Sequence, residues 1–376
     1  MQIQRTYQDL AKKLKPNHVF LLYGPRRVGK TTLITEFLKK TTLKYKFDTG
    51  DNFSTQEILS IPELSNIKDY VGNYELIVID EAQKIKNIGS TLKLMTDHIP
   101  DLKIIATGSS SFELAGQIGE PLTGRKFTYK LFPISQMELK NHYSPFEIKQ
   151  NLEHYMVYGT YPNVITANNS DESRQFLEEL VGSYLLKDIL ELEQLKDPKI
   201  LRDLLKLLAF QIGNEVSLNE IGKQLGISSK TVGRYLDLLE KNFIIYNLRG
   251  FSQNLRKEIT KKSKYYFFDN GIRNTLISNF NTLNNRNDQG QLWENFIVIE
   301  RLKKRTYNNL YANDYFWRTW EQQEIDLIEE SNGQLNGYEF KFNKKKTPKP
   351  PSDWVNTYPN STYQVINTEN YLDFIT

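Results

Sequence analysis

One segment near the N-terminus constrains the fold more than any other part of the chain. Residues 24–31 read Gly-Pro-Arg-Arg-Val-Gly-Lys-Thr, a complete G-x-x-x-x-G-K-T phosphate-binding loop. The apolar run 18–23 predicts a buried strand before this loop, and residues 32–40 predict a helix after it. Such an arrangement aims backbone N–H groups and a helix N-terminus at phosphate. The sequence therefore predicts a nucleotide-binding α/β unit.

Each residue type in the loop has a chemical role. Gly24 and Gly29 permit a close approach of the backbone to phosphate, which a Cβ atom would obstruct. Lys30 can reach the β- and γ-phosphates, and the Thr31 hydroxyl can bind Mg²⁺. We expect the nucleotide to contact the whole loop: Gly24, Pro25, Arg26, Arg27, Val28, Gly29, Lys30, Thr31 and Thr32.

A second signal follows at residues 76–83, where four apolar residues run directly into two carboxylates. An all-apolar strand is typical of a parallel sheet covered on both faces, and ligands bind at the carboxyl end of such strands. We expect Asp80 to hold Mg²⁺ and Glu81 to polarise the water that attacks the γ-phosphate. A buried strand that ends in a solvated acidic turn is the alternative.

Two further polar groups are candidates for the same site. The strand 103–107 leads into a serine-rich turn, where Ser109, or its neighbours Thr107 and Ser110, can sense the γ-phosphate. Arg125 precedes another predicted strand and is a candidate arginine finger for a neighbouring subunit, which would make the protein a homo-oligomer. An ordinary turn and a surface salt bridge are the respective alternatives.

These segments resemble those of prokaryotic AAA-type ATPases of the archaeal-ATPase group. The matching stretches are 24–32, 76–83, 106–110, 122–135, 158–164 and 184–189. The resemblance implies a mononucleotide-binding α/β core followed by a small helical region, and ATP rather than GTP as the nucleotide. The sequence has no guanine-selective Asn-Lys-x-Asp element, which agrees with ATP.

Residues 136–200 predict helices, over 146–158 and 174–195, with apolar positions at helical spacing. Core packing accounts for that spacing, and we expect a lid or linker that nucleotide state moves. The pair Asp197-Pro198 marks a break before the next part of the chain.

Residues 201–270 predict a winged helix. Ser217 and Glu220 form a capping box, and two short helices follow around Gly226, the second running to about residue 241. Strands are expected over 243–248 and 264–269.

Basic and hydroxyl groups in this part of the chain suit DNA. They are Ser228, Ser229, Lys230 and Arg234 on the second helix, and Arg249, Arg256, Lys257, Lys261, Lys262 and Lys264 in the hairpin. A purely structural or protein-binding wing is the alternative.

Residues 271–376 predict a helix over 290–300 and strands over 316–318, 324–328 and 337–342. Alternation along the last two strands places Asp326, Glu339 and Lys341 on one face, and Glu294 on the helix can join them. Two carboxylates beside a lysine can bind a divalent metal and activate water for phosphodiester cleavage.

This pattern resembles the D…E-x-K core of restriction-endonuclease-like nucleases, written PD-(D/E)XK, with Ile325 in place of the usual Pro. It also resembles the C-terminal domain of unknown function that accompanies this ATPase family. The resemblance implies a second divalent metal, bound in the C-terminal domain, in addition to the Mg²⁺ of the ATP site. A hairpin with a solvated face, or a nuclease fold without catalysis, explains the same alternation.

Composition limits the remaining possibilities. The chain of 376 residues has no cysteine, which excludes disulfides, zinc thiolates and thiol catalysis, and its four histidines lack metal-ligand spacing. The net charge of +4 does not by itself indicate a nucleic-acid partner. No stretch is long enough to span a bilayer, so we expect no membrane partner and a cytoplasmic location.

Together these features predict an α/β protein with four parts: an ATPase core with a parallel sheet (1–135), a helical lid (136–200), a winged helix (201–270) and a restriction-endonuclease-like domain (271–376). We expect an Mg²⁺-dependent ATP-hydrolysing switch that acts on DNA. The alternative is a regulatory ATPase that gates protein assembly, with the nuclease-like part as an inactive scaffold.

Overall fold

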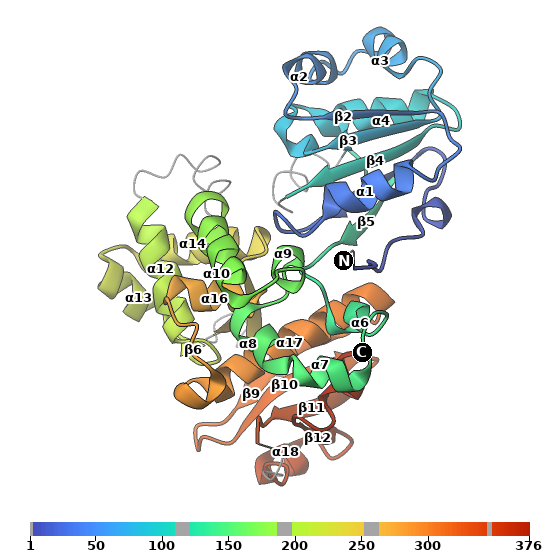
Figure 1. Cartoon of the computed structure of the whole chain (residues 1–376). Helices are drawn as coiled ribbons and strands as arrows, with labels where there is room; N and C mark the ends of the chain where they lie inside the picture. The colour runs from blue at the N-terminus through green and yellow to red at the C-terminus, as the bar shows by residue number, and fades with distance from the viewer. Residues whose placement is uncertain (1–2, 110–120, 186–197, 252–262, 344–347) are drawn as a thin grey trace. The chain divides into compact units, whose positions relative to one another are not determined.

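The computed structural model describes residues 3–109, 121–185, 198–251, 263–343 and 348–376 (Figure 1). The chain forms two compact units. The smaller unit comprises residues 4–132 and 241–243, and the larger one comprises 133–240 and 244–376 together with the first three residues.

The smaller unit is built on a five-stranded, fully parallel sheet with the order β2-β3-β4-β1-β5. Its strands are β1 (His18–Tyr23), β2 (Tyr45–Thr49), β3 (Leu76–Asp80), β4 (Lys103–Gly108) and β5 (Lys126–Lys130). Helices α1 (Lys30–Leu38), α2 (Phe53–Leu59), α3 (Leu64–Val71) and α4 (Ile88–His98) surround it, with short 3₁₀ turns at Leu10–Lys12 and Ala82–Lys84 (Figure 1). The predicted parallel α/β arrangement is confirmed. Every residue of β3 is buried, because strands lie on both sides of it.

The larger unit begins with short helices. They are α6 (Gln136–Leu139), α7 (Pro145–Gln150), α8 (Leu152–Tyr158), α9 (Pro162–Ile165) and α10 (Ser170–Glu179), followed by a π turn at Leu180–Tyr184. The single helix predicted over 146–158 is wrong. Asn151 ends α7 and begins α8, and its side chain donates to the carbonyl of Glu147. The helix predicted over 174–195 ends its regular α-turns at residue 179, and residues 186–197 lie outside the described part.

Helices α12 (Pro198–Phe210), α13 (Leu218–Leu225) and α14 (Ser229–Lys241) come next. Ser217 caps α13 by accepting a hydrogen bond from the backbone N–H of Glu220, and Gly226 ends it in the left-handed conformation. A helix–turn–helix arrangement with a preceding helix is therefore present in this segment.

The second half of the larger unit contains a mixed seven-stranded sheet with the order β12-β11-β10-β9-β7-β8-β6. Its strands are β6 (Glu215–Val216), β7 (Ile245–Gly250), β8 (Ser263–Phe267), β9 (Asn313–Arg318), β10 (Glu324–Ser331), β11 (Gln334–Phe340) and β12 (Thr362–Ile366). Its helices are α16 (Asn270–Leu276), α17 (Gln289–Asn308), α18 (Ser352–Thr357) and α19 (Tyr371–Ile375), with a 3₁₀ turn at Leu283–Asn285. The hairpin β7–β8 and strands β9–β12 share this sheet because β7 pairs with β9 in parallel.

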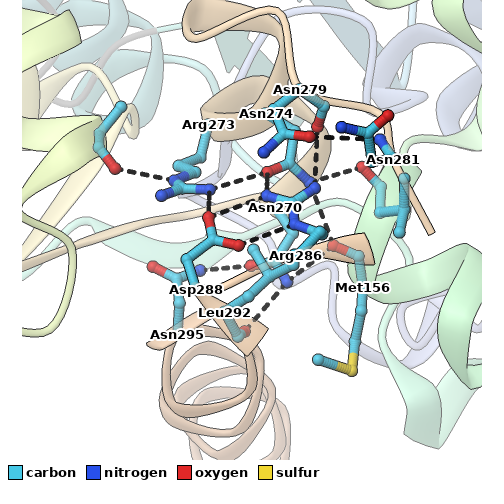
Figure 2. Close-up of polar contacts among 12 residues, drawn as sticks. Met156, Asn270, Arg273, Asn274, Asn279, Asn281, Arg286, Asp288, Leu292 and Asn295 are labelled. Carbon is cyan, nitrogen blue, oxygen red and sulfur yellow. Dashed lines mark hydrogen bonds and ion pairs between the residues drawn. The ribbon is translucent and has the colours of Figure 1, made fainter. Parts of the chain in front are cut away.

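A buried polar network connects α8, α16 and α17 (Figure 2). Asp288 accepts hydrogen bonds from both Arg273 and Arg286. Asn270 Nδ2 donates to the carbonyl oxygens of Met156, at 3.1 Å, and Leu292, at 3.2 Å. Burial would raise the pKa of Asp288, but hydrogen bonds from the two guanidinium groups hold that pKa at about 2. The network therefore ties three helices together through mutually satisfied groups.

A second buried contact explains the motif at residues 158–164. Asp269 accepts hydrogen bonds from the backbone N–H groups of Thr160, at 2.7 Å, and Gly271, at 2.8 Å. A Cβ atom on Gly159 would lie 2.0 Å from Asp269 Oδ1, so only glycine fits there. Burial raises the pKa of Asp269 to about 6. The motif therefore joins the end of α8, and the two residues after it, to the start of α16.

No helix in the described ranges combines the length and the apolar character that a membrane span requires.

Candidate functional site

The first candidate site lies at the carboxyl ends of β1, β3 and β4, which meet at one edge because these strands are adjacent and parallel. Thr31 Oγ1, at the start of α1, donates to Asp80 Oδ2 at 2.7 Å. Thr107 Oγ1, on β4, donates to the other oxygen of Asp80 and accepts from the backbone N–H of Glu81 at 3.1 Å. Thr31 and Asp80, predicted from separate motifs, therefore lie in direct contact.

The backbone of the phosphate-binding loop packs against neighbouring segments of the smaller unit. A Cβ atom on Gly24 would lie 1.9 Å from the carbonyl oxygen of Leu131, so the loop backbone packs directly on the segment after β5. Gly29 has a φ of +92°, a conformation that favours glycine. Lys30 is 5% exposed, and its Nζ donates to the carbonyl oxygens of Gly24, at 2.7 Å, and Pro25, at 2.8 Å.

A residue outside the motif also contacts this loop. The guanidinium group of Arg5, which is nearly buried, donates to the carbonyl oxygen of Val28 in the loop and, at 2.6 Å, to that of Phe132. This role of Arg5 could not be predicted, because a single arginine before the first strand carries no local signal.

The side chain of Glu81 is fixed by a neighbouring amide. Glu81 has a φ of +49°, and its Oε2 accepts from Gln83 Nε2 at 2.5 Å. The same Nε2 contacts Ser109 Oγ at 3.1 Å. Gln83 therefore links the predicted water-activating carboxylate to the predicted γ-phosphate sensor, a role that its position in the Asp-Glu-Ala-Gln stretch did not reveal. Ser110 lies outside the described residues.

Arg125 donates through Nε to Asp97 Oδ1. Its side chain is 40% exposed. The salt bridge and the inter-subunit role were both expected as alternatives, and the second remains a prediction.

Exposed polar groups also gather on the helix–turn–helix. Ser228, Lys230 and Arg234 are exposed, and Ser229 is half-buried. Ser228 Oγ accepts from the backbone N–H of Thr231 at 3.1 Å and so caps α14. Arg256, Lys257, Lys261 and Lys262 lie outside the described residues.

A second cluster lies in the larger unit and contains the residues of the predicted nuclease-like site. Glu294 comes from α17, Asp326 from β10 and Glu339 from β11, and Lys341 follows β11. Lys341 Nζ donates to Glu339 Oε1, and Asp326 Oδ2 accepts from the backbone N–H of Phe340 at 2.7 Å. Burial, followed by the charges of Glu294 and Glu339, raises the pKa of Asp326. The structure therefore places these side chains in one region, as strand alternation predicted.

Lys264 of β8 corrects one expectation. It was predicted as part of a basic surface, but its side chain is only 2% exposed. Its Nζ contacts Glu324 Oε1 and lies 3.3 Å from Glu294 Oε1. This arrangement could not be predicted from the local sequence, because the carboxylate partners of Lys264 lie 30 and 60 residues further along the chain.

The carboxylates of this cluster do not fit a divalent metal. Among the described residues no group of three or more His, Asp or Glu side chains is placed to hold a metal ion. Glu294 already accepts from Lys264 and Tyr266, Glu339 from Lys341, and Asp326 from a backbone N–H. Glu339 Oε2 is buried without a hydrogen-bond partner, but one such oxygen does not make a metal site.

Three segments of the chain match models of known protein families. Residues 16–140 match an AAA domain, and residues 289–373 match a domain of unknown function (DUF4143). Residues 149–283 match another domain of unknown function (DUF8612). The N-terminal part of the chain is therefore similar to AAA domains, and its C-terminal part is similar to DUF4143 domains.

Two uncharacterized proteins align with most of this chain and with most of their own length. An uncharacterized protein of Mycobacterium tuberculosis is 28% identical over 335 residues, which cover 88% of this chain and 72% of the relative. An uncharacterized protein of Methanocaldococcus jannaschii is 24% identical and covers 85% of this chain and 74% of the relative. A solved structure of a Thermotoga maritima RuvB variant aligns with 61% of this chain and 81% of its own, at 18% identity and a TM-score of 0.29, too low to support an argument.

Proposed function

We propose that this protein is an Mg²⁺-dependent ATP-hydrolysing switch. The contact between the Thr31 hydroxyl and Asp80, 2.7 Å apart beside the phosphate-binding loop, is the observation that supports this most directly. A hydroxyl and a carboxylate are oxygen ligands of the kind that Mg²⁺ prefers, so these two residues fit an ion that accompanies ATP. That ion would neutralise charge on the phosphates.

The residues of the chain itself have distinct roles in this proposal. Lys30 leaves the carbonyl oxygens of its own loop to bind the β- and γ-phosphates. Glu81 accepts hydrogen bonds and is the group that orients and polarises the attacking water. Ser109, in contact with Gln83, reports the presence of the γ-phosphate to Glu81.

The Glu81→Gln variant tests this assignment. An amide cannot take a proton from water, so ATP binding should persist while the turnover rate falls by about 10²–10⁴-fold. Binding of a fluorescent ATP analogue and release of phosphate measure the two effects separately. Glu36→Gln, at a half-buried position on α1 where the carboxylate pairs with Lys39, is the matched control and should leave both unchanged. Normal hydrolysis by Glu81→Gln would show that another group activates the water.

DNA is the partner that we propose for the helix–turn–helix. The exposed groups Ser228, Lys230 and Arg234 at the start of α14 are suited to phosphates and base edges. Duplex binding measured by anisotropy should weaken steeply between about 50 and 200 mM salt. The double variant Lys230→Ala/Arg234→Ala should reduce both the affinity and the salt slope, whereas Lys223→Ala on α13 should change them little. A flat salt response would favour a protein partner.

For residues 289–366 we propose a restriction-endonuclease-like fold without catalytic metal. The succession α17-β9-β10-β11-α18-β12, with β12 parallel to β11, supports this fold. The carboxylates already accept hydrogen bonds from protein donors, so the cluster is not expected to cleave DNA. Plasmid incubated with the protein, ATP and Mg²⁺ or Mn²⁺ should remain intact while ATP is hydrolysed. Cleavage that disappears in Lys341→Ala would instead establish a nuclease.

A further inference from the structure

The buried ammonium group of Lys264 lies among carboxylates from two elements. Glu294 belongs to α17, whereas Glu324 and Asp326 belong to β10. Lys264 itself belongs to β8, whose backbone pairs with β6 on one side and with β7 on the other. The side chain is therefore anchored in an inner strand and extends to acidic groups that are distant in the sequence.

Lys264 is held in place by several contacts. Its Nζ donates to Glu324 Oε1 and, at 3.3 Å, to Glu294 Oε1, and it lies 5.4 Å from the centre of the Phe316 ring. The hydroxyl of Tyr266, two residues along the same strand, donates to Glu294 Oε1 at 2.6 Å. Glu294 Oε1 thus receives two donors from β8.

We propose that the Lys264 ammonium is the resident cation of this carboxylate cluster and takes the place of a divalent metal. This inference rests on the proposed nuclease-like arrangement of Glu294, Asp326, Glu339 and Lys341. A buried carboxylate group needs a compensating charge. Here β8, the second strand of the hairpin after the helix–turn–helix, provides that charge.

The protonation state of Lys264 agrees with this role. Burial acts to lower its pKa, but the charges of Glu294, Asp326 and Glu324 outweigh burial and raise the pKa above its ordinary value. The side chain is therefore an ammonium at neutral pH. Two further positive charges lie at the edge of the cluster: Lys341, which donates to Glu339, and Arg318, whose guanidinium lies 3.8 Å from Glu324.

Removal of this cation should turn the cluster into a metal site. Lys264→Met keeps an unbranched apolar side chain of similar length and deletes the charge. The carboxylates around Lys264 then lose their buried counter-charge, and a divalent ion can replace it. The variant should be destabilised, and Mn²⁺ should restore part of its melting temperature because it binds the folded state.

The experiment uses Mn²⁺ alone, with nucleotide-free full-length protein that carries Asp80→Asn so that the ATP site contributes no metal. Bound Mn²⁺ is counted by electron paramagnetic resonance, and melting temperature is measured in parallel. Lys264→Met should gain one Mn²⁺ site, at least about tenfold tighter than any in the parent. Adding Asp326→Asn should abolish that site. Lys223→Met, at an exposed position on α13, is the control and should gain none.

The parent protein gives an independent test should Lys264→Met fail to fold. Asp326→Asn should leave Mn²⁺ binding by the parent unchanged, because an ammonium already compensates the cluster. Loss of a bound Mn²⁺ on this substitution would overturn the inference, as would a folded Lys264→Met that gains no site. ATP hydrolysis by the chain with Asp80 intact is scored separately, so failure of the proposed ATPase is distinguishable.

Discussion

Asp80 in the smaller unit and Asp326 in the larger unit are each 7% exposed, yet they have different surroundings. Asp80 accepts hydrogen bonds from two neutral hydroxyl groups, those of Thr31 and Thr107. Asp326 lies near two other carboxylates and the Lys264 ammonium. Neutral hydroxyl groups bring no positive charge to Asp80, so an incoming cation can still do so, whereas an ammonium group already lies near Asp326. Two equally buried carboxylates therefore suit different roles: Asp80 suits a ligand site, whereas Asp326 suits interactions within the protein.

Loss of the phosphate-binding lysine should have the largest effect on ATP binding, and a variant that still binds ATP would break the comparison. Lys30→Ala removes the cation that we expect to bind the β- and γ-phosphates, so ATP affinity should fall at least about 100-fold. Isothermal titration with ATP and Mg²⁺ measures it. Lys39→Ala, at the exposed end of α1, is the control and should bind ATP normally. Unchanged affinity in Lys30→Ala would show that the loop does not bind the nucleotide phosphates.

The stability of the larger unit should be most sensitive to substitutions where buried groups hydrogen-bond to one another. In Gly159→Ala, the new Cβ would lie 2.0 Å from Asp269 Oδ1 at a φ of +78°. We expect the free energy of unfolding of this unit to fall by about 4 kcal/mol, because both the packing and the hydrogen bonds of Asp269 are disturbed. Urea denaturation measures this change.

Gly226→Ala is the matched control for that prediction. Gly226 has a similar φ of +67° with nothing within 4 Å of an added Cβ, so backbone strain of about 1 kcal/mol is the expected cost. Equal losses in the two variants would mean that the contact with Asp269 contributes nothing beyond backbone conformation.

The titration of Asp269 should make the stability of the larger unit depend on pH. Its pKa is about 6 in the folded protein, against an ordinary value of 3.8, so the folded state binds the proton more tightly. The stability that this proton contributes is complete below pH 3.8 and is lost as the pH rises through about 6. A shift of about two units corresponds to about 3 kcal/mol.

Asp269→Asn removes this titration. The stability of the wild type relative to the variant should therefore fall by about 3 kcal/mol between about pH 4 and pH 7, whatever the variant loses at all pH values. Urea denaturation at a series of pH values measures the difference. Asp171→Asn, at an exposed position on α10, should follow the wild-type profile. Parallel profiles for wild type and Asp269→Asn would contradict the raised pKa.

The same contrast explains what could be predicted from the sequence. The contact between Thr31 and Asp80 could be predicted because each residue ends a local pattern, and parallel strands bring such ends to one edge. The convergence of Asp326, Glu339 and Lys341 followed from strand alternation.

Long-range compensation could not be predicted in this way. Lys264 looked like a surface residue because lysines are rarely buried without partners, and its partners become neighbours only in the folded sheet. The pairing of β7 with β9 involves two residue pairs, Arg249 with Tyr315 and Gly250 with Phe316, and no local pattern specifies it. Gln83 carried no signal either, because an amide after an acidic pair is an ordinary turn residue.

Arg5 provides the smallest and most discriminating test, because it is a nearly buried cation in the smaller unit. Its guanidinium holds the carbonyl oxygens of Val28 and Phe132, and so fixes the shape of the phosphate-binding loop from outside the motif. Arg5→Ala should weaken ATP binding by about tenfold, equivalent to about 1.4 kcal/mol, while the turnover rate at saturating ATP stays close to wild type. Lys12→Ala, at an exposed position in the same N-terminal segment, should change neither value. A fall in turnover without a change in affinity would place Arg5 in the chemical step. If ATP binding and turnover are both unchanged, the phosphate-binding loop keeps its shape without Arg5.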